Sequence, residues 1–432
     1  MLKMEPEALL TKLIIRCLVY DNKKDIIDLL NRYPINWDRF KDLILYHEVT
    51  PFAYLVFEKI DASIPDNFNL FLKNNYHRNL INSQQLWNEF LRITTSFDQE
   101  GITLLPIKGI ALLPDLYEGK PVRPMRDIDL LFKERDIQAV LRLFDEMGYK
   151  EESYGLKNEY WRQNHYHVMF YKTKGHDKIF VEAHYGLDYK REGAHILSEL
   201  WPRIREVKLF NNNLIKFLSP EDTFFSLTLH NRRFGRALCF KSIYDIILLL
   251  VKYKDIFDWD YVLAQSKKYR LNTTAFFALA QAGLVYDLDI PVFVQKELHI
   301  PGCKRALINN FIQKNAFSPR LKKKQKKLLY LKSHFLLYDS MLEPIRYIIN
   351  IPKEQFAQYY GLEPYDSKTE YFYKNRLIYI IFWGVGDFIK TLVGGSSLCK
   401  KQDNGISGGS VRQLKREESS RLNPRSQNEE KL

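Results

Sequence analysis

Two aspartates, Asp127 and Asp129, lie two residues apart in an otherwise apolar run that continues through Phe132. Side chains of a β-strand alternate between its faces, so in a strand these two carboxylates point the same way. Adjacent carboxylates repel each other, and burying them without a partner is costly. A divalent cation removes that cost, and Mg²⁺ takes carboxylate and phosphate oxygens as ligands. The pair predicts a metal platform for phosphoryl chemistry; the less favoured alternative is a solvated strand edge.

A third acid stands in a second segment of strand character. Residues 178–185 read as a short strand in which Glu182 has mostly apolar neighbours. Two-metal sites need an acid that bridges the ions and further acids beside the nucleophile. Asp127, Asp129 and Glu182 supply such a set, and we predict them as catalytic and metal-ligating residues. A surface acid is the alternative for Glu182.

Histidines accompany these acids. His184 lies two residues after Glu182, on the same predicted strand face, where it orients the acid or contacts substrate. His165 and His167 share a face too. Zinc held by His165, His167 and His184 is a chemically reasonable alternative. The three carboxylates explain more of the sequence, so we rank zinc below Mg²⁺.

The order of these motifs resembles a known enzyme group. Lys108-Gly109 precedes a short predicted helix ending near Tyr117, and the segment 123–131 carries the aspartate pair. This arrangement is similar to the polymerase-beta-type nucleotidyltransferase superfamily, and most of all to its uncharacterised nucleotidyltransferase family, found largely in bacteria. The resemblance covers residues 20–385. Other segments that match the family are 164–167, 181–185, 218–222, Leu229-His230 and 243–245.

The resemblance implies a fold and a reaction. The fold class is α+β, a small mixed nucleotidyltransferase-type sheet with flanking helices, plus N-terminal helices and a C-terminal helical domain. The reaction moves a nucleoside monophosphate from a nucleoside triphosphate to a hydroxyl acceptor and releases pyrophosphate. Two Mg²⁺ ions at the three acids lower the pKa of the acceptor hydroxyl and hold the triphosphate.

Basic residues near the aspartates are predicted to hold the nucleotide. Lys108 and the N–H of Gly109 would bind the β- and γ-phosphates at a helix start, where anions are favoured. Most of the superfamily has Gly-Ser or Gly-Gly there, so the donor base stays open. Arg123 or Arg126 would add positive charge, and a salt bridge to a nearby acid is the alternative for each. His184 completes the predicted nucleotide-binding residues.

The chain divides by composition and periodicity. Residues 1–95 are predicted as an N-terminal helical region and 96–218 as the nucleotidyltransferase-like α/β core, with strands at 102–107, 127–132, 167–171 and 179–184. Residues 219–395 are predicted as a helical domain that begins with the acids Glu221 and Asp222. Residues 396–432, which have little apolar content, are predicted to form a disordered basic and polar tail.

The composition constrains the cellular location and the partners that we expect for this protein. Four cysteines without paired spacing predict reduced thiols, the N-terminus lacks a secretory pattern, and no segment is a convincing membrane span, so we expect a cytoplasmic protein. The apolar segment 377–385 is too short to span a membrane. A formal net charge of +13 favours anionic partners.

Other function classes remain open. The lysine-rich run 320–327 keeps a nucleic-acid-associated basic protein as an alternative, although it lacks interleaved aromatics. The other alternative is a catalytically inactive nucleotide-binding protein, an antitoxin-like or maturation partner. The predicted donor is a nucleoside triphosphate, with ATP among the options. The sequence leaves the acceptor open between a small molecule, a peptide, a protein and an RNA end.

Overall fold

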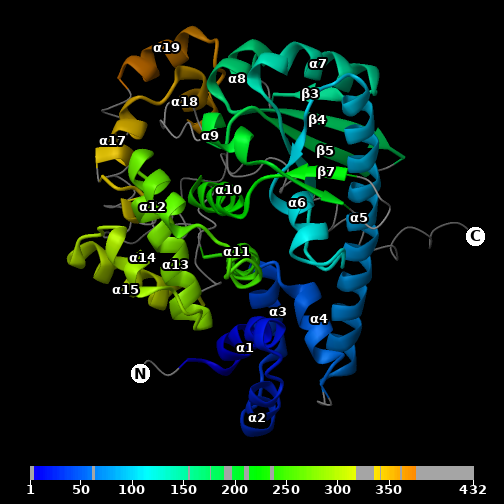
Figure 1. Cartoon of the computed structure of the whole chain (residues 1–432), viewed down its shortest axis with the longest axis vertical. Helices are drawn as coiled ribbons and strands as arrows, with labels where there is room; N and C mark the ends of the chain where they lie inside the picture. The colour runs from blue at the N-terminus through cyan, green and yellow to red at the C-terminus, as the bar shows by residue number, and fades with distance from the viewer. Residues whose placement is uncertain are drawn as a thin grey trace, which may run out of the picture. The chain divides into compact units, whose positions relative to one another are not determined.

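The computed structural model describes residues 4–60, 64–153, 156–175, 177–188, 197–208, 214–233, 238–317, 335–340, 342–360 and 362–375. These residues form an α+β structure with one five-stranded mixed sheet and many helices, as predicted (Figure 1). The lysine-rich run 320–327, the apolar segment 377–385 and the tail 396–432 lie outside the described residues.

The large sheet has the strand order β1-β2-β5-β4-β3. Strand β2 pairs in parallel with β5, and the other neighbours pair antiparallel. A separate two-stranded sheet joins β6 to β7. The strands are β1 (Leu105–Pro106), β2 (Asp127–Leu131), β3 (Lys150–Glu152), β4 (His167–Lys174), β5 (Asp177–His184), β6 (Arg205–Lys208) and β7 (Leu214–Phe217).

The predicted strand at 102–107 is longer than the observed one, because β1 contains only Leu105 and Pro106. Proline has no N–H for a ladder hydrogen bond, which suits it to the edge position that β1 occupies. Strands β3, β6 and β7 were not predicted from the sequence. They are short and carry charged residues, so neither an apolar run nor a clear alternation marks them.

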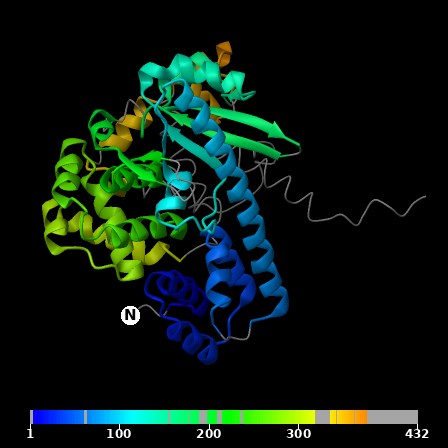
Figure 2. The same ribbon diagram turned by 45° about the vertical axis from the view of Figure 1, so that its right-hand side comes forward.

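Helices before the sheet follow the predicted apolar spacing. They are α1 (Pro6–Tyr20), α2 (Lys24–Arg32), α3 (Trp37–Tyr46), α4 (Thr50–Phe57) and α5 (Asp66–Gln99). The 34-residue helix α5 packs against α4, α6 (Lys108–Asp115) and β2. Both views show it as a long rod beside the sheet, with α4 next to its N-terminal half (Figures 1 and 2). Apolar residues such as Phe90, Ile93 and Phe97 are fully buried there.

Helices that follow β2 include α7 (Ile137–Glu146), which the short 3-10 turn η1 (Glu134–Asp136) precedes, and α8 (Asn158–Asn164). The predicted helix at 134–147 therefore forms, with its first turn as a 3-10 helix. After β5 come α9 (Leu197–Leu200), η3 (Trp201–Arg203), α10 (Pro220–Arg233), α11 (Phe240–Lys252), α12 (Trp259–Lys268), α13 (Asn272–Tyr286), α14 (Val292–Glu297), α15 (Gly302–Asn315), α17 (Leu342–Ile349), α18 (Lys353–Tyr360) and α19 (Ser367–Lys374).

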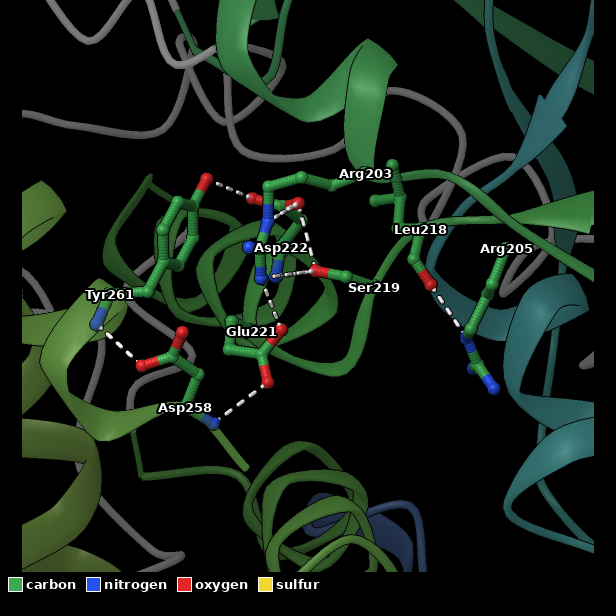
Figure 3. A network of polar contacts seen from close by, with 8 residues as sticks. All are labelled: Arg203, Arg205, Leu218, Ser219, Glu221, Asp222, Asp258 and Tyr261. Atoms are coloured by element: carbon green, nitrogen blue, oxygen red, sulfur yellow. Dashed lines mark hydrogen bonds and ion pairs between the residues drawn. The ribbon is translucent and has the colours of Figure 1, made fainter. Parts of the chain in front are cut away.

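The segment 218–222 contains the N-terminus of α10, and its polar side chains bind one another and neighbouring elements there. The Asp222 backbone N–H donates to Ser219 Oγ over 3.1 Å, and Ser219 Oγ donates back to the Asp222 carboxylate over 2.8 Å. The first contact is the N-cap hydrogen bond of a helix start, and the second holds the Ser219 hydroxyl in position for it. Arg203 and Tyr261 also bind the acids of this first turn, as Figure 3 shows. The predicted acidic helix start is present, and its acids are already engaged in fixing α10 to η3 and α12.

Two compact units emerge from the chain: residues 1–152 with 161–344, and residues 153–160 with 345–432. The first contains both sheets and the helices through α15, except for the first residues of α8. In the second, α18 packs on α19, and the Lys157 backbone N–H donates to the Tyr365 hydroxyl over 3.3 Å. The four-part division made from the sequence stays a prediction. Within the described residues, no helix combines the length and apolar character needed to cross a bilayer.

Candidate active site

Strand register gathers the predicted residues on one face of the large sheet. Asp129 of β2 is paired with Glu182 of β5, and His167 of β4 is paired with His184 of β5. Paired residues of neighbouring strands share a face, and residues two apart on one strand do too. Asp127, Asp129, Glu182, His184 and His167 therefore project from the same side of three adjacent strands.

Lys108 lies inside this group. Its ammonium Nζ is 2.5 Å from Asp129 Oδ1, 3.5 Å from Glu182 Oε2 and 3.3 Å from His184 Nε2. The side chain is only 7% exposed. Its backbone has φ of +53°, a left-handed conformation that is strained for a residue with a side chain. Such strain concentrates at functional sites, so the bend between β1 and α6 is consistent with a role in this group.

The acids are unequal electrostatically. Burial, helped by the charges of Asp129 and Glu182, raises the pKa of half-buried Asp127 to about 7. Burial also opposes the ionisation of Glu182, but the nearby Lys108 ammonium and the two histidines hold the pKa of Glu182 well below its usual value. The charge of one lysine does not balance the charges of three carboxylates. Binding of a further cation would therefore be favoured at this site.

The histidines are buried beside the acids. His184 Nε2 lies 3.0 Å from Asp129 Oδ1 and 3.2 Å from Glu182 Oε2. One ligand atom from each of His167, Glu182 and His184 falls within 4.8 Å of the others. Burial lowers the pKa of His167 to about 4 despite the neighbouring Glu182, so this imidazole is neutral near pH 7.

His165 does not join this cluster. It precedes β4 and stacks on Trp161, with ring centroids 3.7 Å apart. The zinc alternative predicted His165, His167 and His184 as ligands. Among the described residues, the possible ligands that lie together are His167, His184 and Glu182. His165 lies outside β4, so strand spacing does not place it on a shared face with His167, although the two rings are neighbours with centroids 6.0 Å apart.

Gly109 and Arg123 are packed tightly together. A Cβ atom at Gly109 would lie 2.7 Å from Arg123 Nη1, so a larger residue here would have to displace the Arg123 guanidinium. Arg123 is buried and binds Asp245 of α11 in a two-pronged contact, Nε to Oδ1 at 2.8 Å and Nη2 to Oδ2 at 2.7 Å. The Tyr117 hydroxyl donates to the same carboxylate over 2.7 Å. Arg123 therefore forms a salt bridge, which was the alternative for this residue, and this salt bridge joins the α/β core to α11.

The other predicted arginine is at the surface. Arg126 is exposed, and its Nη2 lies 3.2 Å from Glu48 Oε1. Glu48 also pairs with Lys241 at the start of α11, and the Lys241 charge lowers the pKa of Asp127 against the dominant effect of burial. No sequence pattern singles out Lys241, because it belongs to no motif and lies far along the chain from the aspartates.

The donor set fits a divalent cation chemically. Three carboxylates and two imidazoles converge on one sheet face, and a buried ammonium already occupies a position against three of their ligand atoms. Oxygen ligands of this kind are those that Mg²⁺ takes in phosphoryl-transfer sites.

Comparison with known proteins agrees with the resemblance seen in the sequence. A family described as "uncharacterised nucleotidyltransferase" matches residues 33–287. No curated protein matches the chain. The matched region contains α3 to α13, with both sheets and every residue of the candidate site. Because the match spans more than half of the 432 residues, the protein belongs to the uncharacterised nucleotidyltransferase family.

Proposed function

We propose that this protein transfers a nucleoside monophosphate from a nucleoside triphosphate to a hydroxyl acceptor and releases pyrophosphate. Family membership supports nucleotidyl transfer in general. The observation that carries the finer proposal is the excess of carboxylates around Lys108, with Asp129 and Glu182 directly paired across β2 and β5. That arrangement suits binding of divalent cations and, with them, of a triphosphate.

Asp127, Asp129 and Glu182 are the residues that would hold Mg²⁺. When bound, Mg²⁺ supplies an acidified acceptor hydroxyl and neutralises charge on the phosphates. Asp127 is half-buried, so its carboxylate is within reach of a ligand that arrives from solvent. Asp129 is buried, and Asp129 and Glu182 would define the side of the acceptor.

Lys108 would exchange partners during binding. Its ammonium holds Asp129 in the structure. With a cation held by that carboxylate, the Lys108 ammonium would be free to contact a phosphate oxygen near the start of α6. The N–H of Gly109 would be the accompanying backbone donor. His184, whose Nε2 atom lies against Asp129 and Glu182, would contact the bound nucleotide or its cation.

The two arginines take different roles in this proposal. Both guanidinium prongs of Arg123 are bound to Asp245, so Arg123 would position the segment before β2 rather than contact phosphate. Arg126 is half exposed and has a surface salt bridge, which is worth little and breaks readily. Arg126 is therefore our choice for a contact with the triphosphate.

The test is a calorimetric titration of the full chain with non-hydrolysable ATP, GTP, CTP and UTP analogues, with and without Mg²⁺. We expect Mg²⁺-dependent binding of one base or more. The double change Asp127→Asn with Asp129→Asn should weaken binding by about 100-fold or more, because the carboxylates that hold the cation are lost.

A matched control removes two negative charges elsewhere. Asp145→Asn with Glu146→Gln changes two exposed acids at the end of α7 and should leave nucleotide affinity within about two-fold, since surface charge acts weakly at a distance. Absence of nucleotide binding by the folded wild-type chain would contradict the proposal. Binding without labelling of any acceptor would favour the inactive nucleotide-binding alternative.

A further inference from the structure

The candidate site contains nitrogen ligands as well as oxygen ligands. His184 is 1% exposed, and its Nε2 atom contacts both Asp129 and Glu182. His167, which is 6% exposed, is paired with His184 across β4 and β5. Hard oxygen-binding ions such as Mg²⁺ gain little from imidazole, whereas Zn²⁺, Co²⁺ and related ions bind it well.

Nε2 is the nitrogen of His184 that faces the acids. It lies 3.0 Å from Asp129 Oδ1, 3.2 Å from Glu182 Oε2 and 3.3 Å from the Lys108 ammonium. A cation that displaces the ammonium would therefore meet this nitrogen together with two carboxylate oxygens.

The separation of the ligand atoms is compatible with one small ion. The cluster of His167, Glu182 and His184 lies within 4.8 Å, and the contacts of His184 Nε2 with carboxylate oxygens are 3.0 and 3.2 Å. Ligands about 2.0–2.2 Å from a shared Zn²⁺ ion lie roughly 3–4 Å from one another. Small side-chain rotations therefore bring this set to coordination distance.

We infer that His167, Glu182 and His184 form a nitrogen-containing metal position that selects a borderline transition metal, Zn²⁺ or Co²⁺, over Mg²⁺. Asp127 and Asp129 lie on the neighbouring strand and would hold Mg²⁺ through oxygen alone, and Glu182 would be shared between the two positions through its two carboxylate oxygens. The inference rests on the proposed function for its use in catalysis. The two cations would then occupy positions that differ in ligand chemistry.

The experiment titrates the full chain with ZnCl₂ alone and, separately, with MgCl₂ alone, without nucleotide. All samples carry Cys303→Ser and Cys399→Ser, so that thiols near the surface or near the C-terminus do not compete for Zn²⁺. We expect one Zn²⁺ per chain, bound about 100-fold or more tightly than Mg²⁺. His184→Asn and His167→Gln should each weaken Zn²⁺ binding by about 10-fold or more and change Mg²⁺ binding less than about three-fold.

Two further variants serve as matched controls. His77→Ala removes an exposed histidine of α5 and should leave Zn²⁺ affinity unchanged. Asp127→Asn should weaken Mg²⁺ binding and leave Zn²⁺ binding within about three-fold. Equal loss of Zn²⁺ and Mg²⁺ affinity in the His184 and His167 variants would overturn the inference, because the histidines would then only support the acids.

A measurement on the chain with both histidines intact tests the inference even if a variant at one of these buried positions fails to fold. X-ray absorption of the chain with one equivalent of Zn²⁺ should show two imidazole ligands, and ligation by oxygen alone overturns the inference. Zn²⁺ binding without nucleotide binding would contradict only the proposed function. Mg²⁺-dependent nucleotide binding with no dependence of Zn²⁺ affinity on the histidines would contradict only the metal selection.

Discussion

Two buried basic residues, Lys108 and Arg123, lie near the same segment of chain and have opposite surroundings. Arg123 meets one carboxylate, Asp245, and both of its oxygens are used by Arg123 and Tyr117. Lys108 meets Asp129 and Glu182, with Asp127 close enough for its pKa to be raised by its neighbours. The first group is balanced and fully hydrogen-bonded, while the second has more acid than base.

The difference separates a structural ion pair from a candidate functional site. A buried pair with matched geometry holds two elements together and has no use for a ligand. An excess of buried carboxylate costs stability, and that cost falls when a cation binds. The following predictions test this contrast, from the largest expected effect to the smallest.

Breaking the balanced pair should cost the most. Asp245→Ala leaves the Arg123 charge buried without its partner, so we expect the free energy of unfolding to fall by about 3–5 kcal/mol in urea denaturation. Glu146→Ala is the control, because its salt bridge with Arg142 joins two exposed side chains and should contribute less than about 1 kcal/mol. Similar losses in both variants would refute the structural role of the Arg123 pair.

Removing the lysine of the unbalanced group should have a cation-dependent effect. Without divalent cations, Lys108→Met should lower the free energy of unfolding by about 2–3 kcal/mol, because Asp129 and Glu182 lose their counter-ion. Mg²⁺ should restore most of this loss and bind more tightly than to the wild type, since no ammonium competes for Asp129. The control Lys268→Met removes an exposed lysine and should show no Mg²⁺ dependence. A Lys108 variant that Mg²⁺ does not rescue would argue against a cation position there.

Neutralising Asp127 should stabilise the fold while it weakens metal binding. The pKa of Asp127 is raised to about 7, so at pH 8 its charged form disfavours folding. Asp127→Asn should raise the free energy of unfolding by about 2 kcal/mol at pH 8 without divalent cations, at about 1.4 kcal/mol per unit of pKa shift and allowing for relaxation. At pH 5.5 the carboxyl is largely protonated and the gain should shrink. A gain that is the same at both pH values would point to packing instead of charge.

The smallest expected effect concerns His47, a buried residue that belongs to neither group. It is fully buried and stacks on Phe240 with ring centroids 3.8 Å apart, and burial lowers its pKa to about 3. The unfolded chain takes up the proton below pH 6.5 and the folded chain does not, so stability is lost as the pH falls. Between pH 7.5 and 5.5 we expect a loss of about 1.4 kcal/mol.

The matched variant for that prediction is His47→Phe, which keeps an aromatic ring against Phe240. Its unfolding free energy should fall less over the same pH range, by the amount assigned to His47. Denaturation curves at pH 7.5, 6.5 and 5.5 measure the difference. Identical slopes for the variant and the wild type would show that other groups cause the acid sensitivity.

Local patterns in the sequence were enough for parts of the fold and of the candidate site. The two-residue period of a strand predicted a shared face for Asp127 with Asp129 and for Glu182 with His184, and all four lie on the observed strands. The α+β class and the acidic start of α10 followed in the same way. The catalytic and metal-binding roles of these residues remain predictions.

Contacts between distant segments could not be predicted from those patterns. The pairing of Asp129 with Glu182, the return of Lys108 onto Asp129, and the union of Arg123 with Asp245 join residues far apart in the chain. Periodicity states which face of an element is apolar and says nothing about which element packs on it. For the same reason the positions of His167 beside Glu182 and of Lys241 near Asp127 came only from the structure.

The sequence by itself therefore determined the chemistry available to this protein: acids and imidazoles at strand spacing, next to a lysine and glycine at a helix start. Tertiary structure decided how that chemistry is divided. Strand register brought three acids and two histidines to one face, and the packing of α11 took Arg123 into a closed pair. The physical reason is that local spacing fixes side-chain direction, whereas charge balance depends on every group that the folded chain brings within a few ångströms.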